Sequence, residues 1–192
     1  MTIRRPLALL PLACAFALGA CGGDAPPPAA STPAPTSDAP APAAPAPAPA
    51  PAATAGNGKP AAVVENCATE IGSNDAMQYD VGSIAIPSSC TQFTITLRHD
   101  GTLPEQSMGH NVVIAKASEL AAVATDGMAA GAASEFVKPG DPRVVAHTEV
   151  IGGGERTSVT FDVAPLRDGG PYQFFCSFPG HWAVMKGDIS VQ

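Results

Sequence analysis

Short runs of alternating apolar and polar residues mark the chain from about residue 60 onward. Residues 91–98 alternate strictly and place Phe93, Ile95 and Leu97 on one face, which is typical of a half-buried β-strand. Residues 158–163 repeat this pattern. Further β-like runs and the turn signals between them follow: residues 112–114, 143–146, 172–175 and 187–191, with turns at 100–101, 139–140, 152–154 and 168–170. Many short strands with regular turns predict a β-sandwich or barrel.

One segment departs from the β pattern. Residues 117–130 are rich in alanine, and Ser118 is a suitable N-cap before Glu119 and Leu120. Gly127 is a suitable end for a helix. We therefore expect one short helix inserted in the β framework, with its end at Gly127.

Residues 1–20 have the pattern of an export signal. Two arginines precede an apolar run, residues 6–20, which is too short to span a bilayer comfortably. The following Leu-Gly-Ala-Cys, residues 18–21, resembles a bacterial lipoprotein box in which Cys21 carries the lipid. Gly22 after the cysteine favours the outer membrane of a Gram-negative bacterium. The alternative is a soluble exported protein in which Cys21 is incidental.

Residues 21–59 read as the lipid-anchor cysteine followed by a disordered linker rich in alanine and proline. Residues 24–59 contain eleven prolines and no Val, Ile, Leu, Phe, Tyr or Trp, so they cannot bury enough apolar surface to fold. Alternating Ala-Pro favours polyproline II, which makes this segment a stiff spacer of up to roughly 110 Å. A docking ligand is the alternative, but the segment lacks basic or aromatic flanks. The globular domain is then expected at residues 60–192.

The predicted domain is acidic. It contains 15 Asp and Glu against 7 Lys and Arg, which leaves eight excess negative charges. An acidic domain without a basic stripe argues against nucleic acid as a partner. It indicates a partner that is either basic or docks through an uncharged patch.

The cysteines of the domain number three. An exported protein lies in an oxidising compartment, so two of them are expected to pair, and the odd one needs a reason. Cys67 and Cys90 lie outside any aromatic or histidine context, and a bridge between them would stabilise the fold by about 3 kcal/mol. Cys176 ends an aromatic run and precedes a turn with a histidine. Metal coordination would protect such a thiol from oxidation.

Two parts of the domain carry the side chains of a mononuclear copper site. His110 precedes a predicted strand, while Cys176, His181 and Met185 follow another with the spacing Cys-x4-His-x3-Met. Two imidazoles, one thiolate and a weak thioether are the ligands of trigonal copper with a long axial bond. Zinc is the alternative, but thioether is a poor zinc ligand and structural zinc sites prefer more thiolates. The remaining histidines of the domain are expected to be non-ligands: His99 and His147.

The residues around these ligands resemble azurin, a bacterial cupredoxin family. The matching stretches are residues 108–111, 125–129, 144–148, 158–163, 174–181 and 185–187. The Cys-x4-His-x3-Met spacing is characteristic, because related cupredoxins use different loop lengths. A leader, a lipoprotein box and an Ala/Pro spacer before such a domain resemble the lipid-modified azurins of some Gram-negative bacteria.

This resemblance implies an all-β fold, an eight-stranded Greek-key cupredoxin β-sandwich with one short inserted helix. It also implies a Cys67–Cys90 disulfide at one end of the sandwich. One copper ion per chain would complete the domain, of the kind called type 1 or blue copper.

The resemblance further implies a role for each residue of the site. His110 and His181 would bind copper through ring nitrogens and Cys176 through its thiolate. Met185 would be the long axial ligand, with the Gly109 carbonyl approaching from the opposite side. Two groups would surround the ligands and tune the thiolate: Asn111 and the backbone N–H of Phe178.

A docking patch is expected around His181, the predicted exposed edge of the site. Apolar residues would ring it: Leu103, Met108, Met128, Phe178, Pro179, Ala183 and Val184. Trp182, the only tryptophan, stands where the family usually has a small residue, and Val112 stands where azurins often have a buried tryptophan. Trp182 is either a partner contact at the rim or a surface aromatic packed on its own loop.

These features predict a monomeric carrier of single electrons between periplasmic or outer-membrane redox proteins, such as c-type cytochromes or a terminal reductase. An enzyme such as a copper oxidase or nitrite reductase would need further coppers, and the chain has only four histidines. The alternative function is that of a copper-binding surface lipoprotein with a protective or interaction role.

Overall fold

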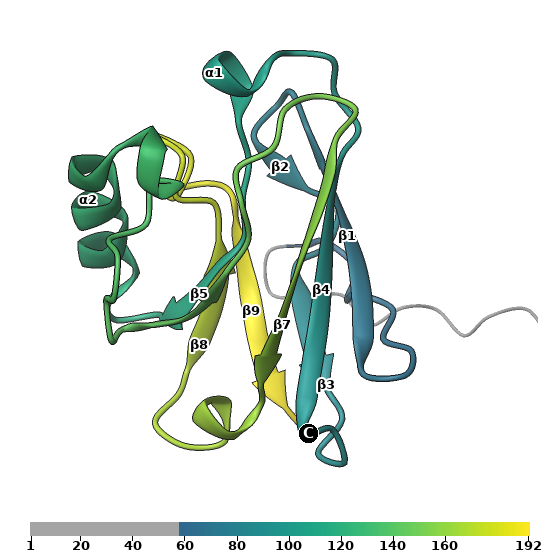
Figure 1. Cartoon of the computed structure of the whole chain (residues 1–192). Helices are drawn as coiled ribbons and strands as arrows, with labels where there is room; N and C mark the ends of the chain where they lie inside the picture. Colours follow the sequence, from purple (N-terminus) through teal and green to yellow (C-terminus); the bar gives the residue numbers. More distant parts are fainter. Residues whose placement is uncertain (1–57) are drawn as a thin grey trace, which may run out of the picture. The chain divides into compact units, whose positions relative to one another are not determined.

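The computed structural model describes residues 58–192, which form a β-rich domain (Figure 1). The predicted leader, Cys21 and most of the predicted linker lie outside the described residues. The strands of the described range are β1 (Ala68–Asn74), β2 (Gln78–Tyr79), β3 (Ser83–Ile86), β4 (Gln92–His99), β5 (Val113–Lys116), β6 (Val144–His147), β7 (Arg156–Asp162), β8 (Tyr172–Phe175) and β9 (Lys186–Val191). The α-helices of the same range are α1 (Glu105–Met108) and α2 (Leu120–Ala130), and the short 3₁₀ helices are η1 (Ala132–Ser134) and η2 (Ala164–Leu166).

The strands form two sheets that face each other. One sheet has the strand order β2-β1-β4-β7 and the other β3-β9-β8-β5-β6. The pairs β1–β4 and β3–β9 are parallel, and the other pairs are antiparallel. The predicted cupredoxin sandwich is therefore confirmed. Its described strands number nine rather than eight, because a two-residue strand, β2, pairs with the end of β1.

The alternation in residues 91–98 produces β4 as predicted. Phe93, Ile95 and Leu97 are fully buried, while the polar residues between them are partly exposed. These side chains pack with residues of the facing sheet, including Ile189 and Phe174, in one apolar core. Burial of this apolar face stabilises the sandwich.

The inserted helix is present, but its predicted ends are wrong. Helix α2 begins after Glu119 rather than Ser118, and it ends at Ala130, followed by Gly131 with a φ of 79°. Gly127 lies inside the helix, where a Cβ would be 2.0 Å from the carbonyl oxygen of Phe136. This position therefore needs a residue without a side chain because the chain packs closely there, and not because the helix stops.

A second, smaller cluster of apolar side chains lies between α2 and the sheet. Val123 and Ala124 of the helix pack there with Val113 and Phe175 of the strands. Helix α1 of four residues was not predicted, and it leads directly into the segment that contains His110. None of the helices within residues 58–192 is long and apolar enough to cross a membrane.

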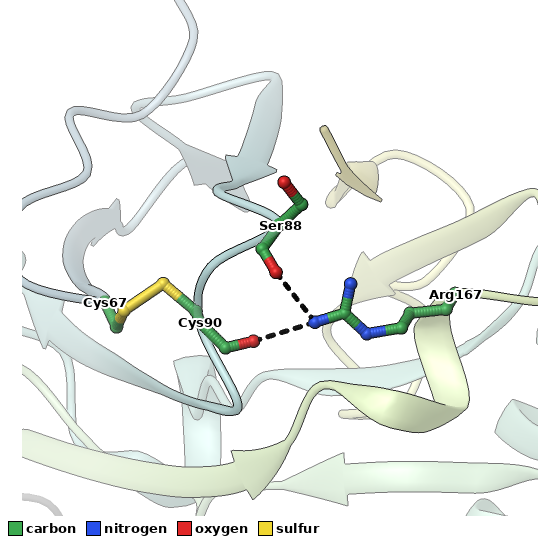
Figure 2. Close-up of a disulfide and its surroundings, with 4 residues drawn as sticks. All are labelled: Cys67, Ser88, Cys90 and Arg167. Carbon is green, nitrogen blue, oxygen red and sulfur yellow. Dashed lines mark hydrogen bonds between the residues drawn. A yellow bond between two sulfur atoms is a disulfide. The ribbon is translucent and has the colours of Figure 1, made fainter.

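The implied disulfide between Cys67 and Cys90 is confirmed (Figure 2). It joins the segments that lead into β1 and β4, and the two cysteines are 23 residues apart in sequence. Arg167 donates hydrogen bonds to the carbonyl oxygens of Ser88 and Cys90, each at 3.0 Å. The bridge and the guanidinium together hold the loop before β4, and Cys176 is the free cysteine of the described chain.

Candidate metal centre

Three side chains that can bind a metal, those of His110, Cys176 and His181, lie close together in the interior of the domain. One nitrogen each from His110 and His181 and the sulfur of Cys176 all lie within 4.8 Å of one another. Cys176 and His110 are fully buried, and His181 is 4% exposed. The predicted exposed edge of the site is therefore smaller than expected, because neighbouring residues cover most of the His181 ring.

His110 is held between α1 and β5. Its backbone pairs with Ile151, with N–H···O distances of 3.0 and 2.9 Å in the two directions. Its ring atom Nε2 lies 2.9 Å from the carbonyl oxygen of Asn74. Because this carbonyl only accepts, it selects the tautomer with hydrogen on Nε2 and leaves Nδ1 free to bind a metal.

The other two donors, Cys176 and His181, lie on the loop between β8 and β9. Cys176 directly follows β8, and its N–H donates to the carbonyl of Met185 at 3.0 Å. The N–H of Met185 in turn donates to the carbonyl of His181 at 2.8 Å. Gly180, with a φ of +87°, provides the turn before His181. The loop is thus closed on itself by backbone hydrogen bonds that bring the three residues together.

Both imidazoles present Nδ1 to the sulfur of Cys176. The distances from Sγ are 3.8 Å to His110 and 3.6 Å to His181. The carbonyl oxygen of Gly109 lies 3.8 Å from the same sulfur. Met185 is fully buried on the same loop. The predicted ligand residues are thus brought to one place from two segments of the chain.

The electrostatics of the site fit a bound cation. Burial raises the pKa of the Cys176 thiol to about 12, although the backbone N–H groups of Asn111 and Phe178 lower it in part. Burial lowers the pKa of His110 to about 4 and also lowers the pKa of His181. Both imidazoles are therefore neutral at pH 7, as metal ligands must be. A buried thiolate needs a positive partner, and a copper ion with two imidazoles supplies one.

Asn111 joins the two ligand-bearing segments. Its side-chain oxygen accepts from the N–H of Ser177 at 2.9 Å, next to Cys176. Its Nδ2 donates to the hydroxyl of Ser177 and to the carbonyl of Glu135, both at 2.9 Å. The amide is fully buried, so these bonds are not replaced by water. The predicted residues Asn111 and Phe178 therefore lie directly around the sulfur.

The predicted apolar patch is largely exposed at the surface. Leu103 is 40% exposed, Met128 39% and Val184 64%, which makes them three of the four exposed large apolar residues of the described chain. Pro179 and Ala183 are also exposed, whereas Met108 and Phe178 are half-buried.

Trp182 packs against the domain rather than projecting from it. It is half-buried and contacts the cluster between α2 and the sheet, which contains Val123 and Phe175. Figure 1 shows the yellow β8–β9 connection beside α2, as this contact requires. The large ring therefore packs the ligand loop against this cluster, a role that neither sequence interpretation included.

His99 was not predicted to lie near the site. It is 1% exposed, and its ring centroid is 4.5 Å from that of His110. Its Nε2 lies 3.2 Å from a carboxylate oxygen of Asp75. The structure places His99 outside the group of three donors. The sequence did contain a signal for its burial, because residue 99 continues the inward-facing positions of β4. His147 lies at the exposed end of β6.

A cupredoxin sandwich with a buried His–Cys–His group defines the class of mononuclear copper-binding domains. Residues 65–192 match the family of copper binding proteins, plastocyanin/azurin family. The chain therefore belongs to the plastocyanin/azurin family of copper-binding proteins.

Individual azurins are similar to this chain over nearly their whole length. An azurin from Alcaligenes faecalis is 57% identical over 125 residues, which are 65% of this chain and 98% of the relative. An azurin from Pseudomonas aeruginosa is 49% identical over 126 residues, 66% of this chain and 85% of the relative. The solved azurin Az-iso2 from the obligate methylotroph Methylomonas sp. strain J has 45% identity and a TM-score of 0.65, with 67% of this chain and 99% of that chain covered. The resemblance to azurin is thereby confirmed, and copper is the metal of the site.

Proposed function

We propose that the chain carries single electrons through one type 1 copper ion. The observation that supports this best is the fully buried thiol of Cys176 between the Nδ1 atoms of two neutral imidazoles. Copper held by such ligands accepts and releases one electron. No bond of a substrate is made or broken in this function, so no catalytic residue is proposed.

Each residue of the site has a role in this proposal. His110, Cys176 and His181 would hold the ion, Met185 would be a weak axial ligand, and the carbonyl of Gly109 would approach from the other side. Burial and the closed hydrogen bonds of the loop restrict movement of these groups. A site that keeps its geometry in both oxidation states needs little reorganisation, which favours rapid electron exchange.

The proposed partners are redox proteins of the periplasm or outer membrane, such as c-type cytochromes or a terminal reductase. Exposed apolar residues around the site suit brief, weak docking. The proposed patch consists of the exposed residues Leu103, Met128, Pro179, Ala183 and Val184 and of the half-buried residues Met108 and Trp182. The domain would work as a monomer.

We further propose that the chain is a lipid-modified azurin. Residues 1–20 would direct export, Cys21 would carry the lipid, and residues 21–59 would space the domain at 60–192 from the outer membrane. The four-residue lipoprotein box and the proline-rich composition support this arrangement. Labelling of cells with a radioactive fatty acid tests it, because only a chain with an intact Cys21 would take up the label, and a Cys21→Ala variant would not.

The visible spectrum of the chain with Cu(II) tests the electron-transfer proposal. An intense blue band that is absent in Cys176→Ser and bleaches reversibly with reductant is the expected result. His110→Gln should weaken the band, whereas His147→Gln, at an exposed position outside the site, should leave it unchanged. A pale spectrum for the unaltered chain would contradict the proposal.

A further inference from the structure

The dipeptide Glu135–Phe136 lies in an uncommon backbone conformation beside the copper site. The φ angles are 56° and 51°, in the left-handed region that residues with side chains rarely adopt. Such conformations cost free energy and persist only where the surroundings over-determine them. The contacts of this dipeptide therefore show what maintains it and what it supports.

Helix α2 and the turn after it hold the dipeptide in place. The N–H of Phe136 donates to the carbonyl of Gly131 at 3.1 Å, and the N–H of Glu135 donates to the carbonyl of Ala132 at 2.9 Å. Gly127 of α2 allows the carbonyl of Phe136 to approach the helix closely. The next residue, Val137, is buried in the cluster between the helix and the sheet.

Glu135 contacts two segments near the ligands. Its backbone carbonyl accepts the hydrogen bond from the Asn111 side chain at 2.9 Å. Its carboxylate oxygen Oε2 accepts from the N–H of Val150 at 2.6 Å. The side chain of Val150 lies against Gly109, where a Cβ would be 2.6 Å from it. One residue therefore supports both sides of the segment that contains His110.

Phe136 is connected to the loop that contains His181 through the ring of Phe178. Its ring meets the ring of Phe178 edge to face, with centroids 5.2 Å apart and an angle of 73° between the planes. Phe178 in turn lies against the imidazole of His181, with centroids 4.8 Å apart. Phe136 thus limits the space in which the His181 ring can move.

We propose that Glu135 and Phe136 are positioning residues for the copper ligands, held in place by helix α2. Neither touches the donor atoms. Glu135 fixes the segment of His110 through Asn111 and Val150, and Phe136 fixes His181 through Phe178. The inserted helix then serves as a brace for the ligand loop. This inference rests on the proposed function, because it concerns the geometry of the same copper site.

Phe136→Leu tests the aromatic part of the brace. The variant should show an altered copper hyperfine coupling in its electron paramagnetic resonance spectrum and an altered blue band. It should also lose copper to a chelator about 2- to 12-fold faster, the factor that corresponds to one aromatic pair. Phe136→Tyr keeps the ring and should restore the values of the unaltered chain.

Phe161→Leu is the matched control. It removes a ring from the pair Phe93–Phe161, whose centroids are 6.1 Å apart in the core of the sandwich. It should lower the melting temperature but leave the hyperfine coupling and the blue band unchanged. If both leucine variants changed the copper spectra equally, the effect would be general destabilisation and the inference would be wrong.

Glu135→Ala tests the carboxylate, with Glu149→Ala as a control of equal charge at an exposed position next to Val150. Only Glu135→Ala should alter the hyperfine coupling and speed the loss of copper. An unaltered chain with a blue band, together with Phe136→Leu and Glu135→Ala variants identical to it, would overturn this inference alone. An unaltered chain without the band would overturn the proposed function as well.

Discussion

A single buried amide connects the two halves of the copper site. The side chain of Asn111 makes four hydrogen bonds to Ser177 and Glu135 in a fully buried position. Each buried group that loses such a partner costs about 1–3 kcal/mol, because water cannot replace it. The amide therefore contributes to the fold as well as to the arrangement of the ligands.

Asn111→Leu should lower the free energy of unfolding of the copper-free chain by about 3 kcal/mol, since the N–H of Ser177 and the carbonyl of Glu135 both lose their partner. Urea denaturation measures this change. Asn74→Ala is the control, because its amide accepts only an exposed hydrogen bond from Ala76, at 2.9 Å. Equal losses in the two variants would contradict the role assigned to Asn111.

The ligand residues themselves were predictable because their chemistry is carried by residue type and spacing. Two of the groups that orient them were not, because these backbone carbonyls have no signature in the sequence. The carbonyl of Asn74 holds the His110 ring and the carbonyl of Glu135 holds Asn111. Both depend on how distant segments fold together.

An ion pair before β6 gives the stability of the domain a dependence on acid pH. The Arg143 side chain donates to the carboxylate of Asp141 at 2.8 Å, and this hydrogen bond lowers the pKa of Asp141 to about 2. The side chain of Asp141 is only 2% exposed. Arg143 also lies 2.5 Å from Asp126 of α2, so the pair connects the helix to the sheet.

Asp141→Asn should destabilise the domain at pH 5 but much less near pH 2. The folded-state pKa lies below the unfolded value of about 3.9, so the stabilisation is complete above about pH 4. Most of it is lost by pH 2, where the carboxylate is protonated in the unfolded state and half protonated in the folded state. Urea denaturation of both chains between pH 5 and 2 measures the difference. A difference that stayed constant over this range would contradict the assignment.

Regular alternation of apolar and polar residues predicted two strands correctly. Residues 91–98 and 158–163 became β4 and β7, paired with each other. Strand β1 was missed, because its sequence Ala-Thr-Glu-Ile-Gly-Ser-Asn has one large apolar residue and a glycine. This strand is held instead by its pairing with β4 and by the side chain of Asp80, which accepts a hydrogen bond from the N–H of Gly72. Such contacts are long-range and do not appear in a local pattern.

Gly127→Ala separates helix propensity from packing in α2. Propensity alone would favour alanine by about 1 kcal/mol. The new Cβ would lie 2.0 Å from the carbonyl of Phe136, however, and relief of this overlap must move backbone. We expect a net loss of about 1–3 kcal/mol in the free energy of unfolding. Ala129→Gly, at an exposed position of the same helix, measures the change in unfolding free energy that comes from helix propensity alone. A stabilised Gly127→Ala chain would show that the helix can move away from Phe136.

Acidic residues are concentrated in the segments around the copper site. The four segments 74–80, 99–112, 147–155 and 176–185 contain six Asp and Glu and no Lys or Arg. They lie together. The carboxylate of Asp75 accepts from the N–H of Leu103, whose carbonyl accepts from the N–H of Gly153. The side chain of Asn111 accepts from the N–H of Ser177. Arg98 pairs with Asp100, and Lys59 interacts with Asp80. The excess negative charge at this end therefore rests on four carboxylates: Asp75, Glu105, Glu149 and Glu155. Such an end attracts a redox partner with a positive surface.

Small redox complexes of opposite charge measure this field directly. The copper(I) chain should be oxidised by the cation tris(phenanthroline)cobalt(III) at a rate that falls as ionic strength rises from 0.01 to 0.15 M, whereas the rate with the anion hexacyanoferrate(III) should rise. The double variant Glu105→Gln/Glu149→Gln should lower the rate of oxidation by the cation at least about threefold at low ionic strength, since both carboxylates lie on these segments. Asp162→Asn with Asp168→Asn removes the same charge from β7 and from the loop before β8, outside these segments, and should have little effect. If both double variants lowered the rate of oxidation by the cation equally, the net charge of the chain, and not the charge near the copper site, would govern this reaction.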